Sequence, residues 1–172
     1  MVKWIFFDVG STLVDETEAY DHRVREMIVG TDITPWHSED EVPYADAHST
    51  LAALRQNGYK LGIIANQKLG TAERLGNWGL RQFFDVIAVS AEIGYAKPDK
   101  EIFEKAFELA GCTAQESVMV GDRLDNDIIP AKALGMKTVW LKNGLAQYQP
   151  AELGIGVADY QIGLLSELLA LL

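Results

Sequence analysis

Two groups of acidic residues in this chain each follow directly on a short apolar run. Residues 4–7 are apolar and lead into Asp8, and residues 118–120 are apolar and lead through a glycine toward Asp122 and Asp127. Apolar runs of this length are typical of central strands that are buried on both faces. The ends of such strands would bring these acids to the edge of an open α/β sheet, where ligands bind. Carboxylates gathered around one point repel one another unless a cation is present, so we expect a divalent metal and an anionic substrate.

The segments that must position these acids alternate between strands and helices. Residues 30–43 are polar and are expected to form a loop, and the tail from residue 148 is expected to end in a short amphipathic helix. We expect strands at residues 4–7, 60–65, 85–89, 117–120 and 137–141, and helices at residues 15–29, 44–56, 71–78, 97–110 and 126–134. This alternation predicts an α/β fold with a mainly parallel sheet and helices on both faces, in a single domain of residues 1–172.

The bulk composition narrows the classes of partner. The chain has 172 residues, of which 48% are hydrophobic and 23% charged, as is ordinary for a globular protein. Its net charge of −10 argues against binding to nucleic acid, which needs clustered Lys and Arg. No apolar run approaches the length of a membrane span, and the first residues lack a signal-peptide pattern. The only cysteine, Cys112, fits a reducing compartment, so we expect a cytoplasmic protein.

Four short motifs occur in an order that resembles the haloacid dehalogenase (HAD) superfamily of hydrolases. They are DVGSTL at residues 8–13, LGIIAN at 61–66, GYAKPD at 94–99 and GDRLDND at 121–127. The resemblance implies a Rossmann-like HAD core. It also implies a Mg²⁺-dependent phosphatase that works through an aspartyl-phosphate, with a phosphorylated substrate of unknown identity.

The resemblance also assigns catalytic and metal-binding roles. Asp8 corresponds to the nucleophile, and a carboxylate suits this role because the resulting acyl phosphate is easily hydrolysed. Lys97 corresponds to a lysine that offsets charge on the phosphoryl group and the nucleophile. Mg²⁺ would be held by Asp8, the backbone carbonyl of Gly10 and Asp122, with Asp127 acting on its water shell.

Three further residues are candidates for substrate binding. Ser11 and Thr12 lie in a tight turn whose backbone N–H groups could cradle phosphate oxygens. Asn66 matches the residue that follows a hydroxyl in the second motif, and it could donate a hydrogen bond to the substrate. Asp125 is expected to be a solvated acid at the start of the next helix.

Two positions depart from the pattern of the superfamily. Gly10 stands where most of its phosphatases carry a second Asp, a general acid–base group whose contribution is typically ~10²–10⁴-fold. Ala65 stands where they have Ser or Thr. These departures imply either a substrate with a good leaving group or weak activity. Glu16 or Asp15 could replace the missing acid, although we expect both to cap the following helix at the surface.

Residues 15–43 are the part of the chain left for a cap over the site. One helix and a loop cannot form a bundle, so we expect a rudimentary cap and an open site, which is compatible with a homodimer. Trp36 is expected to pack this segment onto the core. His22, His37 and His48 show no metal-ligand spacing and are expected at the surface.

Two alternatives to a phosphatase stay open. Gly10, Ala65 and the short cap favour a catalytically impaired phosphate-binding or regulatory domain. A metal-free dehalogenase is the other alternative. The pair Asp122 and Asp127 argues against it, because uncompensated carboxylates would repel an anionic haloacid.

Overall fold

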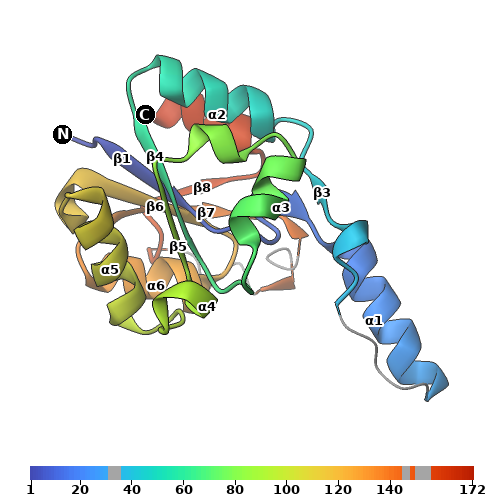
Figure 1. Cartoon of the computed structure of the whole chain (residues 1–172). Helices are drawn as coiled ribbons and strands as arrows, with labels where there is room; N and C mark the ends of the chain where they lie inside the picture. Colours follow the sequence, from blue (N-terminus) through green and yellow to red (C-terminus); the bar gives the residue numbers. More distant parts are fainter. Residues whose placement is uncertain (31–35, 145–147, 150–155) are drawn as a thin grey trace.

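A six-stranded sheet lies at the centre of the computed structural model, which describes residues 1–30, 36–144, 148–149 and 156–172 (Figure 1). The strands are β1 (Trp4–Phe7), β4 (Lys60–Ala65), β5 (Val86–Val89), β6 (Ser117–Gly121), β7 (Lys137–Leu141) and β8 (Tyr160–Ile162). All neighbouring pairs run parallel, in the order β5-β4-β1-β6-β7-β8. The strand order therefore changes direction between β1 and β6, which is where open α/β sheets bind ligands.

Helices cover both faces of this sheet. They are α1 (Thr17–Val29), α2 (Ala47–Gln56), α3 (Thr71–Asn77), α4 (Ser90–Ile93), α5 (Lys100–Ala110), α6 (Ile129–Ala133) and α8 (Leu168–Leu171), with short 3₁₀ turns η1 (Ser38–Asp40), η2 (Arg81–Phe83), η3 (Ala114–Glu116) and η6 (Leu165–Glu167). In β1, Ile5 and Phe7 pack in the core with side chains of α2, α3 and α8. Trp4 and Phe6 point the other way and pack with α5 and α6. These alternating side chains are all buried, which explains why β1 is an unbroken apolar run.

The predicted α/β fold with a mainly parallel sheet is confirmed, and the five longer strands lie within one residue of their predicted bounds. Some short elements differ from the prediction. The helix predicted from residue 44 begins at Ala47, because Tyr44 donates its backbone N–H to Leu13. The helix predicted at residues 126–134 is a π-helical turn, η4 (Leu124–Ile128), followed by α6. The strand β8, at one edge of the sheet, was not predicted.

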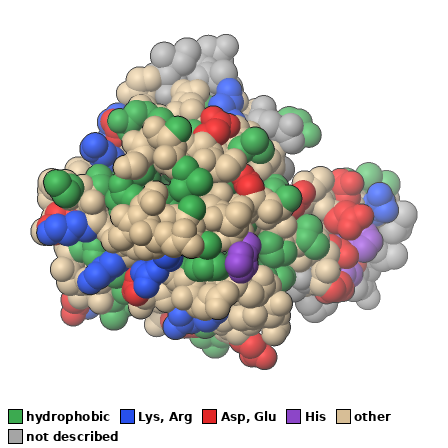
Figure 2. Space-filling model, turned by 90° about the horizontal axis from the view of Figure 1, so that it is seen from above, with side chains coloured by type: hydrophobic (Ala, Val, Ile, Leu, Met, Phe, Trp, Pro, Cys, Tyr) green, Lys and Arg blue, Asp and Glu red, His purple; other side chains and the backbone are tan. Residues whose placement is uncertain are grey.

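The predicted loop at residues 30–43 contains structure where it is described. Strand β3 (Val42–Pro43) pairs antiparallel with β2 (Val14–Asp15), so a small ribbon joins this region to the core. Beyond the ribbon, α1 and η1 form a projection that we call the arm (Figure 1). Figure 2 shows it as a separate lobe at the right, rich in acidic and histidine side chains. The apolar side chains of Val24, Met27 and Ile28 on α1 are exposed.

No helix in the described ranges is both long enough and apolar enough to cross a membrane.

Candidate active site

The two predicted acidic strand ends lie side by side at the point where the strand order changes direction. Asp8 follows β1 and Asp122 follows β6, and the backbone N–H of Asp8 donates to the carbonyl of Val120 at 3.0 Å. Carboxylate oxygens of Asp8, Asp122 and Asp127 all lie within 4.8 Å of one another. The structure therefore brings Asp8 together with two acids that lie more than a hundred residues further along the sequence.

Asp127 reaches this group because the chain turns back sharply after β6. The backbone N–H groups of Asp127 and Ile128 both donate to the carbonyl of Arg123, which closes the wide π-helical turn. A Cβ atom on Gly121 would lie 2.4 Å from the carboxyl carbon of Asp127. Glycine at this position therefore leaves the room that the buried carboxylate needs.

Lys97 supplies positive charge to the acidic group. Its Nζ atom lies 2.7 Å from Oδ1 of Asp8 and 2.5 Å from Oδ1 of Asp127, and its side chain is 2% exposed. The side chain of Asn66 holds the lysine backbone, because it donates to the carbonyl of Lys97 at 2.8 Å and accepts from its N–H at 2.7 Å. Asn66 thus positions Lys97, a contact that the sequence did not predict. Burial opposes the charged form of Lys97, but Asp127 and Asp8 outweigh it and raise its pKa.

The positive charge of Lys97 does not neutralise the whole group. Burial, followed by repulsion from Asp8 and Asp127, raises the pKa of Asp122 to about 9. Burial also raises the pKa of Asp127 to about 6, although the charge of Lys97 opposes this shift. Hard carboxylate and carbonyl oxygens around an excess of negative charge fit a hard cation such as Mg²⁺. The donor set therefore suits the predicted metal, with Gly10 lining the same cavity.

The turn that carries Asp122 is fixed from behind by two side chains. The indole Nε1 of Trp140 donates to the carbonyl of Asp122 at 2.7 Å, and Nε2 of Gln149 donates to the same carbonyl at 2.9 Å. Trp140 is fully buried in β7, where its ring belongs to the core. A tryptophan in an apolar pattern gives no signal in the sequence that its N–H holds a functional turn.

The turn after Asp8 contains the two residues that were predicted to bind phosphate, Ser11 and Thr12. Ser11 has a positive φ of 54° and lines the cavity, as a cradle residue would. Thr12 is fully buried, however, and its backbone N–H donates to the carbonyl of Val9 at 3.3 Å. The same carbonyl accepts from Leu13 and Val14, so the turn closes on itself. The N–H of Thr12 is therefore engaged within the turn, and phosphate binding by Thr12 stays a prediction.

Glu16 lies in the cavity, although the sequence indicated a surface helix cap. It makes no side-chain cap bond to α1, and it is Asp15 that accepts from the backbone N–H of Thr17 at 2.9 Å. The cavity has a volume of about 680 Å³ and is lined by Glu16 together with Asp8 and Lys97. Burial raises the pKa of Glu16 to about 7, and the charges of Asp8 and Glu41 add to this shift.

Asp125 lies at the rim of the same cavity and behaves as expected. Its carboxylate pairs with the guanidinium of Arg123 at 2.6 Å, and both side chains are more than half exposed. The side-chain hydrogen bond from Arg123 holds the pKa of Asp125 below its usual value. The prediction of a solvated acid is confirmed.

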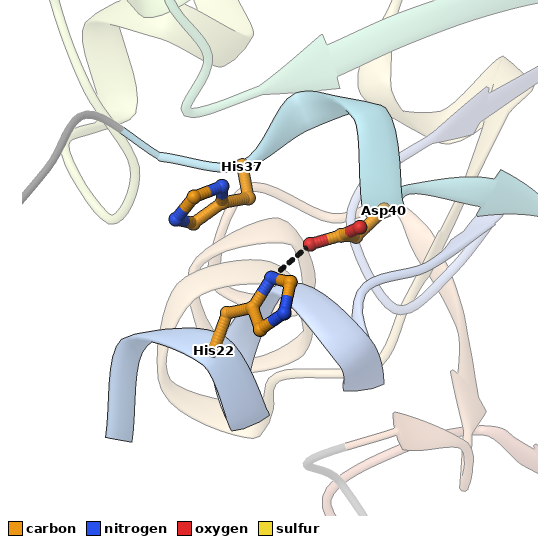
Figure 3. A group of neighbouring side chains, drawn as sticks. All are labelled: His22, His37 and Asp40. Carbon is orange, nitrogen blue, oxygen red and sulfur yellow. Dashed lines mark hydrogen bonds and ion pairs between the residues drawn. The ribbon is translucent and has the colours of Figure 1, made fainter. Parts of the chain in front are cut away.

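A second group of possible metal ligands lies on the arm (Figure 3). Ligand atoms of His22, His37 and Asp40 lie within 4.8 Å of one another, which their spacing in the sequence did not indicate. Nδ1 of His22 lies 2.6 Å from Oδ2 of Asp40, and Nε2 of His37 lies 3.2 Å from Glu26. These contacts join Asp40 of η1, and His37 directly before η1, to α1. His48 is exposed, as expected.

Trp36 packs within the arm and toward the core. Its ring meets that of Tyr20 edge to face at 4.9 Å between centroids, and its Nε1 donates to Glu41 at 2.5 Å. Glu41 in turn pairs with Arg74 of α3 at 2.9 Å. Trp36 therefore links the arm to the core, as predicted.

The chain belongs to the haloacid dehalogenase-like hydrolase family, whose model matches residues 34–141. This range includes Asn66, Lys97, Asp122 and Asp127, and it begins after Asp8. The predicted membership of the HAD superfamily is thereby confirmed.

Several relatives of the chain are named phosphatases. It is 38% identical over 145 residues to a glyceraldehyde 3-phosphate phosphatase of Methanocaldococcus jannaschii, which covers 82% of this chain and 62% of that protein. It is 32% identical over 174 residues to the pyrophosphatase PpaX of Bacillus mycoides, covering 95% and 77%. A solved structure of a HAD phosphatase from Thermococcus onnurineus matches with a TM-score of 0.78 and 27% identity, covering 99% of this chain and 97% of that one. The chain spans about half the length of the glyceraldehyde 3-phosphate phosphatases that it matches.

Proposed function

We propose that the chain is a Mg²⁺-dependent phosphatase in which Asp8 is the nucleophile. The observation that carries the proposal is the difference in access among the three clustered acids. The side chain of Asp8 is 14% exposed and faces the cavity, whereas that of Asp127 is 1% exposed and Asp122 is buried. All three acids line the cavity, and Asp8 is the most exposed of them, which supports Asp8 as the group that meets an entering phosphoryl group.

The proposed chemistry has two steps. A carboxylate oxygen of Asp8 attacks phosphorus, the bond from phosphorus to the ester oxygen breaks, and the leaving group departs as an alcohol after it gains a proton. Water then attacks the phosphorus of the aspartyl-phosphate, the acyl phosphate bond breaks, and inorganic phosphate leaves while the Asp8 carboxylate is restored. Lys97 contacts Oδ1 of Asp8, so it would hold the nucleophile in place and offset charge on the phosphoryl oxygens.

Asp8, Asp122 and the carbonyl of Gly10 would hold Mg²⁺, as the donor set allows. When bound, the ion would supply charge that balances the carboxylates and the phosphoryl oxygens. Asp127 would act on the water shell of the metal and not bind the ion itself. Its Oδ1 atom contacts Lys97, and its Oδ2 atom accepts a hydrogen bond from the backbone N–H of Arg123 at 3.0 Å.

A small phosphorylated metabolite is the proposed substrate class. The relatives named above act, by their names, on a triose phosphate and on pyrophosphate. A cavity of about 680 Å³ accommodates a ligand of this size. We propose that residues 15–43 form the rudimentary cap, since Glu16 and Tyr20 at the base of the arm line the cavity. A homodimer and a cytoplasmic location stay predictions, which sedimentation and fractionation would test.

Turnover of p-nitrophenyl phosphate tests the proposal. We expect Mg²⁺-dependent release of nitrophenolate by the wild type, loss of this activity on chelation of the metal, and none from Asp8→Asn. Asp21→Asn removes an exposed carboxylate of α1 and is the matched control, expected to keep full activity. Equal rates for the wild type and Asp8→Asn would reject the mechanism. Mg²⁺ binding without turnover of any phosphate ester would instead indicate a phosphate-binding domain.

A further inference from the structure

The carboxyl group of Glu16 occupies space that opens only because residue 10 is a glycine. A Cβ atom built on Gly10 would lie 2.4 Å from Oε2 and 2.5 Å from Oε1 of Glu16. Contacts this short do not occur, so any other residue at position 10 would push the Glu16 side chain away. The absence of a side chain at Gly10 therefore leaves the space that the Glu16 carboxyl group fills, at the wall of the cavity that Asp8 also lines.

The chain directs Glu16 to this place through the ribbon that precedes α1. Strand β2 ends at Asp15 and α1 begins at Thr17, so Glu16 sits at the bend between them. Its side chain turns back toward the strand ends, and the hydroxyl of Ser11 lies 3.5 Å from Oε2. Ser11, which has a positive φ of 54°, thus lies between Asp8 and the Glu16 carboxyl group in this turn.

Most of the other charged side chains in the cavity wall are already engaged, and Asp122, which forms no ion pair among the described residues, is assigned to the metal. Lys97 holds Asp8 and Asp127, and Arg123 pairs with Asp125. Among the described residues, the carboxyl group of Glu16 forms no ion pair. The reaction needs a group that gives a proton to the leaving alkoxide and later takes one from the attacking water. Neither the nucleophile nor an acid assigned to the metal can do both.

We propose that Glu16 is the general acid and base of this site, a role that rests on the proposed phosphatase activity. In the first step the Glu16 carboxyl donates its proton to the ester oxygen as the bond to phosphorus breaks, so the product leaves as a neutral alcohol. In the second step the Glu16 carboxylate takes a proton from the water that attacks the aspartyl-phosphate. Phosphate then leaves, and both Asp8 and Glu16 return to their starting states.

A comparison of leaving groups tests this role. Glu16→Gln keeps the size of the side chain but cannot transfer the proton. Cleavage of a primary alkyl phosphate should fall by about 10²–10⁴-fold, since an alkoxide leaves poorly without a proton. With p-nitrophenyl phosphate the first step needs no acid. The variant should therefore release a rapid burst of nitrophenolate, close to one per enzyme, and then turn over slowly because hydrolysis of the aspartyl-phosphate lacks its base.

This burst separates failure of the role from failure of the proposed function. Asp8→Asn should give neither burst nor turnover, whereas a burst from Glu16→Gln requires an intact nucleophile. Glu18→Gln, an exposed acid of the same helix, is the matched control and should behave as the wild type. If Glu16→Gln lowers the rates on both substrates equally and gives no burst, Glu16 has only a structural role and the inference is overturned.

A pair of variants at position 10 tests the geometry independently. Gly10→Asp alone should push the flexible end of the Glu16 side chain aside, because a Cβ atom at position 10 would lie 2.4 Å from its Oε2 atom. Glu16→Ala combined with Gly10→Asp removes this contact and returns a carboxyl group to the same space. This double variant should recover alkyl phosphate cleavage well above that of Glu16→Ala. A double variant no more active than Glu16→Ala, with unchanged circular dichroism, would contradict the proposal.

Discussion

The strand-end site and the arm both gather carboxylates beside basic side chains, but they hold them under different conditions. Lys97 and Asp127 in the site are almost fully buried, whereas His22 on the arm is 48% exposed. Burial raises the pKa values of Asp122 and Asp127 in the site, while the groups of the arm pair with one another near water. Burial of the carboxylates at the strand ends is therefore what raises their pKa values, and similar residue types on the arm are less fully buried.

Among the variants considered, Lys97→Ala should lower the free energy of unfolding most. It leaves the buried carboxylate of Asp127 without its charge partner, so we expect a loss of about 3–5 kcal/mol in the free energy of unfolding. Urea unfolding followed by tryptophan fluorescence measures this change. Lys100→Ala, which removes an exposed lysine of α5, is the control and should unfold nearly as the wild type does. Equally small losses of unfolding free energy in both variants would show that the buried site is no more sensitive than the surface.

Mg²⁺ should stabilise the protein through the site. At a hundredfold excess over its dissociation constant the ion would contribute about 2.7 kcal/mol. In metal-free protein, Asp122 has a pKa near 9 when folded and an ordinary value near 3.8 when unfolded. Its ionisation therefore costs stability as pH rises through this interval. The melting temperature without metal should thus fall with rising pH, and the gain from Mg²⁺ should be larger at pH 8 than at pH 5.5.

Asp122→Asn supplies the check on that result. It should abolish most of the Mg²⁺ gain and weaken the pH slope, as calorimetry in both buffers would show. If Mg²⁺ still stabilises Asp122→Asn but no longer stabilises His22→Ala, the metal binds on the arm and not at the strand ends.

Trp140→Phe should lower the stability of the protein and its affinity for Mg²⁺ by a moderate amount. It keeps the packing of an aromatic ring but removes the hydrogen bond to the carbonyl of Asp122, which costs about 0.5–1.5 kcal/mol. Because the bond fixes the turn that carries Asp122, affinity for Mg²⁺ should also fall. Titration calorimetry measures this affinity, and Trp78→Phe serves as a control, since its ring packs at the core edge away from the site. Equal affinities in all three proteins would show that the turn needs no such support.

The smallest effect is expected on the arm. Replacing His22 by Ala removes the pairing with Asp40, which in an exposed setting contributes less than about 1 kcal/mol. Turnover of p-nitrophenyl phosphate and its Mg²⁺ dependence should be unchanged, because the pairing lies on the arm and takes no part in the cavity. A large loss of turnover would mean that the arm acts on the site more directly than its contacts indicate.

The sequence predicted what local patterns can encode. The apolar runs of β1 and β6 predicted these strands, and the acids that follow the two runs are Asp8 and Asp122. The two-residue strands β2 and β3 are too short for a periodic pattern, so their pairing was missed. Glu16 was assigned to a helix cap because nothing local shows that its side chain turns back to Gly10.

The most direct test of the account is to trap the covalent intermediate. Wild-type protein turning over p-nitrophenyl phosphate with Mg²⁺ is quenched in acid within milliseconds, and its peptides are analysed by mass spectrometry. We expect a phosphoryl group on Asp8, absent when the metal is chelated. A phosphoryl group on a different residue, or steady turnover with unmodified Asp8 at every quench time, would contradict it.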